Sequence, residues 1–483
     1  MANSEETERD SDIQGKPMSE KELHHKLSLL LHTGCLLMKN AADTVRIFRN
    51  MHRVAVFLGI PLENLHIFIN YNVLMVNFSD RWHSYTRFEK VNKHGINMST
   101  LESVSHLSWK AIRDRYSEKE FEEKLSEIEN SHRNYTPLAV AIGGGLACGG
   151  FCVQFGCDWT AFFYAAISAF AGLRLKQLLE RKGWNVYLTV GFVTFVATLI
   201  AWLTSFVSLS PVLSSVLPSF MISDTPWHPL MASALFVVPG VPLINVVSDM
   251  FDGHVQIGMA RAVHTLCVIV AMVFGIALAI KCCGIDNFVK DLNMTPHNSY
   301  IAYMVAAAIS AVGFSMIFNV PVRLLKVVAI GGAIAVCIRN FVNLGPSTNN
   351  IGLDMGIEIG SLVGSTVVSI IAVWAMHRFH TPHHCISIPC VIPMIPGVLM
   401  YRSLFGFITM SGVIGELTFA MYHAVLASLV ILFMAFGVAI PNVFFRQINS
   451  QNRKNRFLRV IVERKNELGE NVDLNRISHH DKE

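Results

Sequence analysis

Ten apolar segments follow one another along the middle of the chain. They lie near residues 138–156, 159–175, 186–208, 229–247, 255–280, 299–318, 323–341, 355–377, 386–405 and 417–440. Ten helices of about 20 residues use roughly 200 of the 303 positions between Leu138 and Ile440, which leaves about 11 for each of nine loops. The pattern predicts an all-α polytopic membrane protein with ten transmembrane helices.

A different pattern precedes these segments. Residues 23–60 carry apolar positions at helical spacing and predict two helices, the second ended by Gly59 and Pro61. Two alternating runs at 65–70 and 73–78, joined by a two-residue turn, predict a β-hairpin, and a third strand is expected at 83–91. Two charged helices follow, so we expect a small α+β domain in front of the membrane part.

The expected organisation has five parts. These are a disordered N-terminus 1–22, a cytoplasmic α+β domain 23–134, membrane half 1 at 137–281, membrane half 2 at 298–441 and a cytoplasmic tail 442–483. The first 22 residues are polar and lack the apolar core of a signal peptide. Lys and Arg gather in the loops after the second and sixth segments and in the tail, whereas residues 208–228 contain none. We therefore expect a multi-pass protein of the cell inner (plasma) membrane with both termini cytoplasmic.

Two interrupted helices reveal an internal repeat. Residues 236–245 read FVVPGVPLIN and residues 391–401 read VIPMIPGVLMY, so two Pro-Gly breaks lie 157 positions apart. Each half then holds five segments. Because five is odd, the second half enters the membrane from the opposite side, which predicts two inverted five-helix repeats. Interrupted helices at matching positions of inverted repeats are typical of secondary transporters.

Composition agrees with a bilayer environment. The hydrophobic residues make up 52% of the chain, and only 15% are charged, against roughly 25% in soluble proteins. The net charge of +4 and the absence of long basic runs argue against a nucleic-acid binder. Five of the ten cysteines lie inside apolar segments, where Cys usually behaves as a small hydrophobe, so their number does not decide the redox compartment.

The two breaks and the polar residues after the first break form the candidate substrate site. A proline in a spanning helix frees backbone groups that lipid cannot satisfy, and the N-terminus of a half-helix favours an anion. The guanidinium of Arg261 would bind a carboxylate, although a position near the cytoplasmic headgroups is the alternative. The substrate-binding candidates are Pro239, Gly240, Pro242, Asn245, Asp249, Arg261, Pro396, Gly397 and Arg402.

Three further residues are candidates for proton coupling. Glu358 stands near the start of the eighth segment, and burial in a membrane favours the neutral form of a carboxyl group. A structural ion pair of Glu358 with Arg339 or Arg402 is the alternative. Asp252 and His254, which follow the first break, complete this set.

Other chemistry finds little support. The glycines at 143–145 lack the Lys and Ser/Thr of a phosphate loop and predict close helix packing. The His-rich stretch 377–385 matches no closed zinc pattern, so we expect a titratable rim rather than a metal site. Since no Ser-His-Asp order and no Walker sequence is found, we expect no enzyme activity and no cofactor.

Several stretches resemble the threonine/serine exporter family. Residues 237–261, VVPGVPLINVVSDMFDGHVQIGMAR, resemble its broken-helix signature and its Asp-x-x-x-Gly-His segment. Residues 310–325 and 391–401 resemble the second, smaller unit of the family, and 27–59 with 87–104 resemble the cytoplasmic part of the first. One departure is Arg46-Ile47-Phe48, where the family usually has Arg-Val-Glu. The whole is similar to the paired inner-membrane succinate export proteins, fused into one chain.

The resemblance implies secondary export of small carboxylate metabolites, either a dicarboxylate such as succinate or threonine and serine, driven by the proton motive force. The expected partners are this substrate, a proton and the lipid bilayer, with no nucleic acid. We expect alternating access around the two broken helices, with N–H groups near Gly240 and Gly397 and the Arg261 guanidinium holding the carboxylate. A passive channel for small organic anions and a membrane sensor are the alternatives, and a homo-oligomer is left open.

Overall fold

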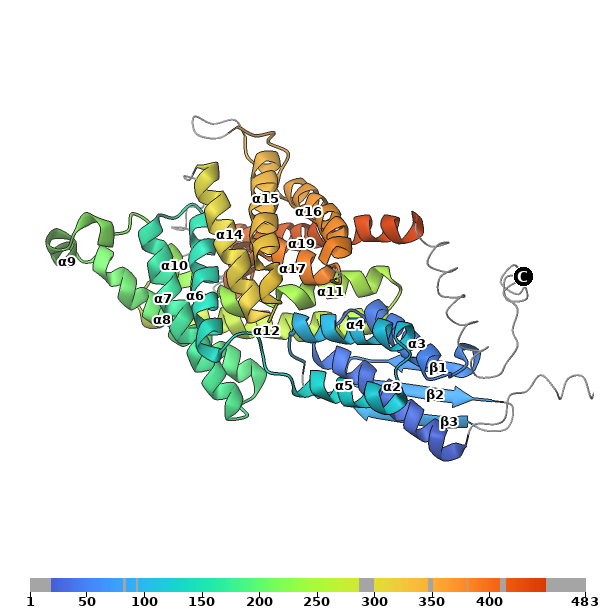
Figure 1. The fold of residues 1–483 in the computed structure, drawn as a ribbon. Helices are drawn as coiled ribbons and strands as arrows, with labels where there is room; N and C mark the ends of the chain where they lie inside the picture. The colour runs from blue at the N-terminus through green and yellow to red at the C-terminus, as the bar shows by residue number, and fades with distance from the viewer. Residues whose placement is uncertain are drawn as a thin grey trace, which may run out of the picture. The chain divides into compact units, whose positions relative to one another are not determined.

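The computed structural model describes residues 19–80, 84–92, 94–285, 299–345, 351–379, 381–408 and 414–448. The chain divides into two compact units (Figure 1). The front unit takes its described residues from 1–95, 100–131 and 444–483, and the helical unit takes them from 96–99 and 132–443.

The front unit combines helices with one small sheet. Its elements are α2 (Glu20–Lys39), α3 (Thr44–Phe57), η1 (Leu62–Asn64), β1 (Leu65–Ile69), β2 (Val73–Ser79), β3 (Ser84–Lys90), α4 (Met98–Arg113) and α5 (Glu118–Asn130). The three strands are antiparallel in the order β1-β2-β3. The hairpin of β1 and β2 lies where the alternating runs predict it, with Ile69 opposite Leu74.

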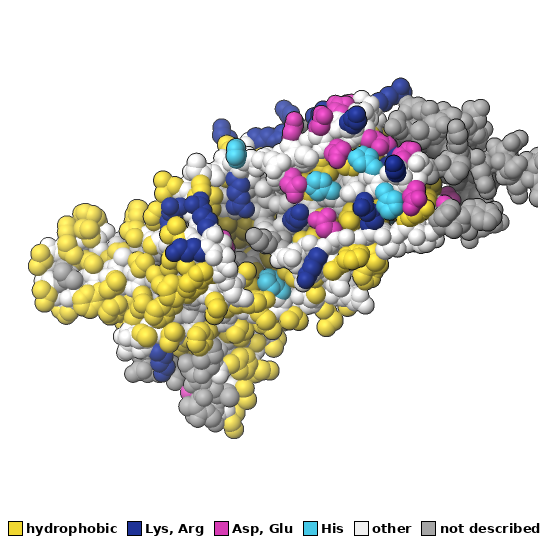
Figure 2. Space-filling model, turned by 90° about the horizontal axis from the view of Figure 1, so that it is seen from below, with side chains coloured by type: hydrophobic (Ala, Val, Ile, Leu, Met, Phe, Trp, Pro, Cys, Tyr) yellow, Lys and Arg dark blue, Asp and Glu magenta, His cyan; other side chains and the backbone are white. Residues whose placement is uncertain are grey.

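The core of the front unit lies between the sheet and its helices. Leu27 and Leu30 of α2, Ile47 and Met51 of α3 and Leu74 of β2 are fully buried. The helix α3 begins where Asp43 accepts a hydrogen bond of 2.9 Å from the Arg46 N–H, an ordinary N-cap. Charged side chains and histidines cover much of the visible surface of this unit (Figure 2).

The helical unit consists of helices only, as far as the described residues show. Its elements are α6 (Pro137–Gln154), α7 (Trp159–Arg181), α8 (Val186–Leu209), α9 (Pro211–Val216), η2 (Ser219–Met221), α10 (His228–Ala232), η3 (Leu235–Val237), α11 (Gly240–Phe251), α12 (Val255–Cys282), α14 (Tyr300–Ile317), η4 (Val322–Leu324), α15 (Leu325–Asn343), α16 (Ile357–Phe379), α17 (His384–Val391), η5 (Ile392–Met394), α18 (Gly397–Ile408) and α19 (Ile414–Ile448).

Six described helices, α6, α8, α12, α14, α16 and α19, are long and apolar enough to cross a membrane. Two bent pairs raise the number to eight if each pair is one span, with bends of 58° before α11 and 54° before α18. The second and seventh expected spans fold as α7 and α15, which lie outside this set. Exposed apolar side chains such as Phe163, Leu203 and Phe274 cover the unit (Figure 2), as a lipid-facing surface requires.

The helices α6 and α14 pack closely through small residues. A Cβ atom added at Gly143 would lie 3.1 Å from the carbonyl oxygen of Gly313, and one added at Gly150 would lie 2.5 Å from that of Ala306. Residues 143 and 306 are 163 positions apart, and so are 150 and 313. The contact of Gly143 with Gly313 therefore corresponds to the contact of Ala306 with Gly150, with the roles of α6 and α14 exchanged.

Candidate functional site

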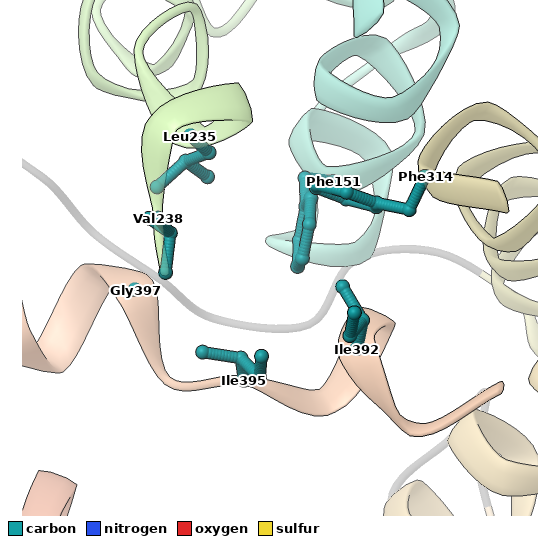
Figure 3. Close-up of a pocket in the computed structure, with 7 residues that line it drawn as sticks. All are labelled: Phe151, Leu235, Val238, Phe314, Ile392, Ile395 and Gly397. Atoms are coloured by element: carbon teal, nitrogen blue, oxygen red, sulfur yellow. The ribbon is translucent and has the colours of Figure 1, made fainter. Parts of the chain in front are cut away.

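The two Pro-Gly breaks lie against each other within the helical unit (Figure 3). A Cβ atom added at Gly240 would be 3.4 Å from Ile392 Cγ1, and one added at Gly397 would be 2.8 Å from Leu235 Cδ2. Gly397 follows Gly240 by 157 positions, and Ile392 follows Leu235 by the same number. The breaks thus make the same contact twice with their roles exchanged, as two elements related by a two-fold axis do.

An apolar hollow lies beside these breaks. Figure 3 shows the residues that line it, which are Phe151, Leu235, Val238, Phe314, Ile392, Ile395 and Gly397. The rings of Phe151 on α6 and Phe314 on α14 meet edge to face, with centroids 5.5 Å apart and planes at 81°. Sequence reasoning missed these two rings, although each directly follows a glycine and they lie 163 positions apart.

At each break the glycine N–H forms a hydrogen bond with a backbone carbonyl two residues earlier. The N–H of Gly240 donates to the carbonyl of Val238 over 2.8 Å, and the N–H of Gly397 donates to that of Ile395 over 2.8 Å. Pro242 occupies the first turn of α11, where an N–H would find no partner inside the helix, so this proline fits without loss. A substrate carboxylate would have to displace these short backbone contacts to reach either N–H group.

Polar candidates meet after the first break, where α11 and α12 lie side by side. The Nε of Arg261 is 3.3 Å from Oδ2 of Asp249, with side-chain exposures of 13% and 1%. Asn245, one turn before Asp249 on α11, is also buried. Two glycines form this arrangement: Gly253 turns the chain with φ +83°, and a Cβ atom at Gly258 would lie 2.8 Å from Met250 Cγ. The guanidinium therefore lies beside the carboxylate within the protein.

The remaining candidates lie elsewhere around this pair. Asp252 is exposed at the end of α11, and His254 begins α12, so both occupy the turn rather than the interior of a span. Arg402 is half-buried on α18, a helix that contacts α12. Its position on α18 corresponds to that of Asn245 on α11, since both are the sixth residue of their helix.

Glu358 is half-buried in the first turn of α16. Within the described residues Glu358 forms no ion pair with Arg339 or Arg402, and the Arg339 guanidinium donates over 3.1 and 3.2 Å to its neighbour Asn340. The alternative ion pair of Glu358 with Arg339 or Arg402 is therefore absent from the described structure.

The histidines before the second break are buried. The His383 ring lies 2.9 Å from the Ser369 hydroxyl and meets the His384 ring edge to face. The His377 side chain and all of His380 lie outside the described residues. In the part of the chain that the structure describes, no group of three or more His, Cys, Asp or Glu side chains could hold a metal ion.

Asn319 joins three segments of the chain by hydrogen bonds. It ends α14 in the left-handed region with φ +53°, which Asn tolerates better than most residues. Its amide donates to the Asn97 side chain over 2.8 Å and its oxygen accepts from the Asn134 N–H over 2.8 Å. The segments 96–99 and 132–135 are thereby fixed to one corner of the helical unit.

A second structural feature that the sequence did not reveal involves Asp158. Besides capping α7, its carboxylate accepts from the Ser223 hydroxyl over 2.8 Å and from the Asp224 N–H over 3.0 Å. These residues are 65 and 66 positions away along the chain, so no local pattern could indicate the contact. The segment between α8 and α10 is held in place by this carboxylate.

Two family models match the chain. The model described as "Putative threonine/serine exporter" matches residues 28–283, and "Threonine/Serine exporter, ThrE" matches residues 303–444. The first match contains α11 and α12 with Asp249 and Arg261, and the second contains the second break. No solved structure gives a match.

Curated relatives agree with these models. The "Probable succinate transporter subunit YjjP" of Escherichia coli (strain K12) is 26% identical over 261 residues, which cover 54% of this chain and 96% of the relative. The protein of the same name from Klebsiella aerogenes is 26% identical over 260 residues, 54% of this chain and 95% of the relative. The "Threonine/serine exporter" of Corynebacterium glutamicum is 22% identical over 435 residues, 89% of this chain and 84% of the relative. The chain is therefore a multi-pass membrane protein that belongs to the threonine/serine exporter family, a family of transporters and not of enzymes.

Proposed function

We propose that this chain is a secondary exporter of small carboxylate metabolites, either a dicarboxylate such as succinate or threonine and serine, driven by the proton motive force. The observation that carries the proposal is the reciprocal contact of the two Pro-Gly breaks, Gly240 with Ile392 and Gly397 with Leu235. Helices broken at matching positions around one centre are how many secondary transporters form a substrate site. The names of the relatives supply the two substrate classes.

The proposed topology is ten spans in two inverted halves, with α7 and α15 as the second and seventh spans. The element lengths support it: α6 and α14 both have 18 residues, and α11 and α18 both have 12. The exchanged contacts of α6 with α14 support it as well. The proposed domains are an α+β domain at 23–134 and membrane halves at 137–281 and 298–441. The protein would lie in the inner membrane, with the α+β domain and both termini in the cytoplasm.

In the proposed site the substrate carboxylate binds the Arg261 guanidinium, with Asn245 and Arg402 as additional hydrogen-bond donors. The breaks at Pro239-Gly240 and Pro396-Gly397 would open and close around it. The apolar hollow beside the breaks supports an occluded state here, because apolar side chains of Phe, Leu, Val and Ile line it. Alternating access would then require these side chains to separate. Glu358, Asp252 and His254 remain the candidates for proton coupling that the sequence suggests.

Counterflow in proteoliposomes tests the proposal. Vesicles holding the full chain are preloaded in parallel with succinate, threonine or serine, and uptake of the labelled compound is measured. Arg261→Ala should abolish uptake, whereas Arg181→Ala, which changes an exposed arginine at the end of α7, should leave it intact. Unchanged uptake in Arg261→Ala would remove Arg261 from the site, and absence of counterflow with all three compounds would favour a passive channel.

A further inference from the structure

Asp249 is unusual among the acidic residues of the helical unit. In the described part of that unit it is the only Asp or Glu that is buried, with 1% of its side chain exposed. It lies near the C-terminal end of α11, nine positions after Gly240 of the first break, and its carboxylate is 3.3 Å from the Arg261 guanidinium on α12. The carboxylate is thus more deeply buried than the guanidinium beside it.

A buried carboxylate keeps its charge only while a close cation or several hydrogen-bond donors compensate for the lost water. The same guanidinium is the proposed binding group for the substrate carboxylate. A substrate carboxylate and the Asp249 carboxylate have the same chemistry and the same planar, two-oxygen geometry. They therefore compete for Arg261.

We propose that Asp249 is the proton-binding residue of this transporter, and that it takes up one proton when the substrate carboxylate displaces it from Arg261. This inference rests on the proposed function. The step balances: one O–H bond forms on Asp249 with a proton from water, one negative charge enters with the substrate carboxylate, and the net charge around Arg261 stays the same. No oxidation or group transfer takes part.

The other titratable and charged groups on the surrounding elements are placed less favourably for this role. Asp252 and His254 lie in the turn, where Asp252 is exposed, and the His264 ring on α12 lies 2.8 Å from the Tyr187 hydroxyl. The elements α18 and α19 contribute Arg402, Glu416 and His423, and α19 reaches α11 through the rings of Phe251 and Phe436, whose centroids are 4.3 Å apart. Of the acids among these groups, Asp249 is the most deeply buried, and it lies 3.3 Å from the Arg261 guanidinium.

The coupling has a consequence for the substrate class. A dicarboxylate that leaves the cell with one proton carries one net negative charge outward. The membrane potential, which is the electrical part of the proton motive force, favours this export, whereas the proton gradient opposes it. A zwitterionic amino acid with one proton carries a net positive charge outward, and the same potential opposes its export. Coupling to one proton at Asp249 therefore favours a dicarboxylate over a zwitterionic amino acid as the exported substrate.

The test counts protons taken up per substrate bound by the purified full chain. Titration calorimetry with succinate in two buffers of different ionisation enthalpy gives this number without any transport step. We expect about one proton per succinate for the wild type, and about none for Asp249→Asn, which should still bind. Asp354→Asn changes an exposed aspartate with φ +53°, a conformation that Asn accepts, and should retain one proton.

Three results would overturn the inference: succinate binding by the wild type without proton uptake, continued uptake in Asp249→Asn, or loss of uptake in Glu358→Gln. If Asp249→Asn does not fold, the wild type and Glu358→Gln are compared instead. Uptake of one proton per succinate by both proteins would exclude Glu358 and support Asp249 as the proton-binding residue. A wild type that binds neither succinate, threonine nor serine would overturn the proposed function, and this inference with it. If only the proton uptake at Asp249 is wrong, succinate still binds. Failure of this inference can therefore be distinguished from failure of the proposed function.

Discussion

Single small residues set how closely the helices of the membrane part approach. Where Gly143 meets Gly313, and Gly150 meets Ala306, backbone lies on backbone with no room for a side chain. At the breaks the situation differs, because Gly240 and Gly397 face the ends of flexible Ile and Leu side chains. The same residue type therefore tolerates change to different degrees at these two places.

Gly150→Ala should destabilise the protein more than Gly240→Ala. The new methyl group at Gly150 would lie 2.5 Å from the Ala306 carbonyl oxygen, and 3.2 Å from the Ser310 nitrogen, so backbone must move. Overpacking of this kind costs about 1–3 kcal/mol. The measurement is the thermal midpoint of the full chain in detergent, with Gly415→Ala, which has nothing within 4 Å, as the control. Equal midpoints for all three variants would contradict the packing argument.

Residue spacing could indicate the polar site but not its pairing. Asp249 and Arg261 both stood out as charged residues near apolar segments. Whether they meet depends on the turn between α11 and α12, where Gly253 takes a left-handed φ and Gly258 lets the helices close. Such geometry is decided by tertiary packing, so the two members of the pair could be predicted from the sequence but their contact could not. For Glu358 the pattern was equally suggestive, yet it lies at a helix end.

At the scale of elements, α5 is held by an apolar contact with α3, where the rings of Phe121 and Phe57 lie 5.1 Å apart, and by charged contacts with α2. Phe121 and Leu125 of α5 are buried, while the outer edge of the helix carries ion pairs. His32 Nε2 lies 2.7 Å from Glu129 Oε2, and Lys39 Nζ lies 3.5 Å from Oε1 of the same carboxylate. Burial raises the pKa of Glu129, but the hydrogen bond from His32 and the charges of His32 and Lys39 lower this pKa by a larger amount, so the net shift is downward.

This shift predicts how the docking of α5 depends on pH. A carboxyl group whose pKa is lower in the folded state stabilises that state above its ordinary pKa, and the contribution disappears as the pH falls through the folded value. Because the Glu129 side chain is about a third exposed, the pairs contribute at most about 1 kcal/mol. Amide exchange of α5 in the full chain should therefore be faster in Glu129→Gln than in the wild type at pH 7, and this difference should be smaller at pH 4, which lies below the ordinary carboxyl pKa of 4.5.

Glu123→Gln is the matched control, because Glu123 is exposed on the same helix. It should leave the exchange of α5 unchanged at both pH values. If Glu129→Gln also left the difference between pH 7 and pH 4 intact, the pairs with His32 and Lys39 would not stabilise the helix.

Elements with a local signal were predictable, and those with a distant partner were not. Alternating residues placed the β1–β2 hairpin, and the Pro-Gly pairs placed the bends before α11 and α18, because both features depend on neighbouring residues. The contact between the two breaks joins residues more than 150 positions apart, and the hold of Asp158 on the segment before α10 spans 65. Neither leaves a periodic trace in the sequence.

For the whole molecule, the number of spans decides which loops face outward. If α7 and α15 cross the membrane, the chain has ten spans and the segment between α8 and α10 lies outside. If only the eight spans identified by length and hydropathy cross, the same segment lies inside, with the N-terminus cytoplasmic in both cases. One loop therefore distinguishes the two topologies.

Alkaline phosphatase fused after Ser215, in the segment between α8 and α10, should be active, because the enzyme matures only outside the cytoplasm. Fusion after Lys182, between α7 and α8, should be inactive. A fluorescent protein that folds only in the cytoplasm is the reciprocal control at both positions. The opposite pattern would mean that α7 does not cross, and the proposal of two five-helix halves would fail.

The interlocked glycine faces of α6 and α14 also bear on biogenesis. The helix α6 lies in the region matched by the first family model and α14 in the region matched by the second, and each fills the groove that the glycines of the other leave open. A ribosome delivers α6 long before α14, so the first half must wait in the bilayer with its groove filled by lipid alone. We therefore expect the two halves, made as separate polypeptides, to be degraded singly and to persist when they are synthesised together.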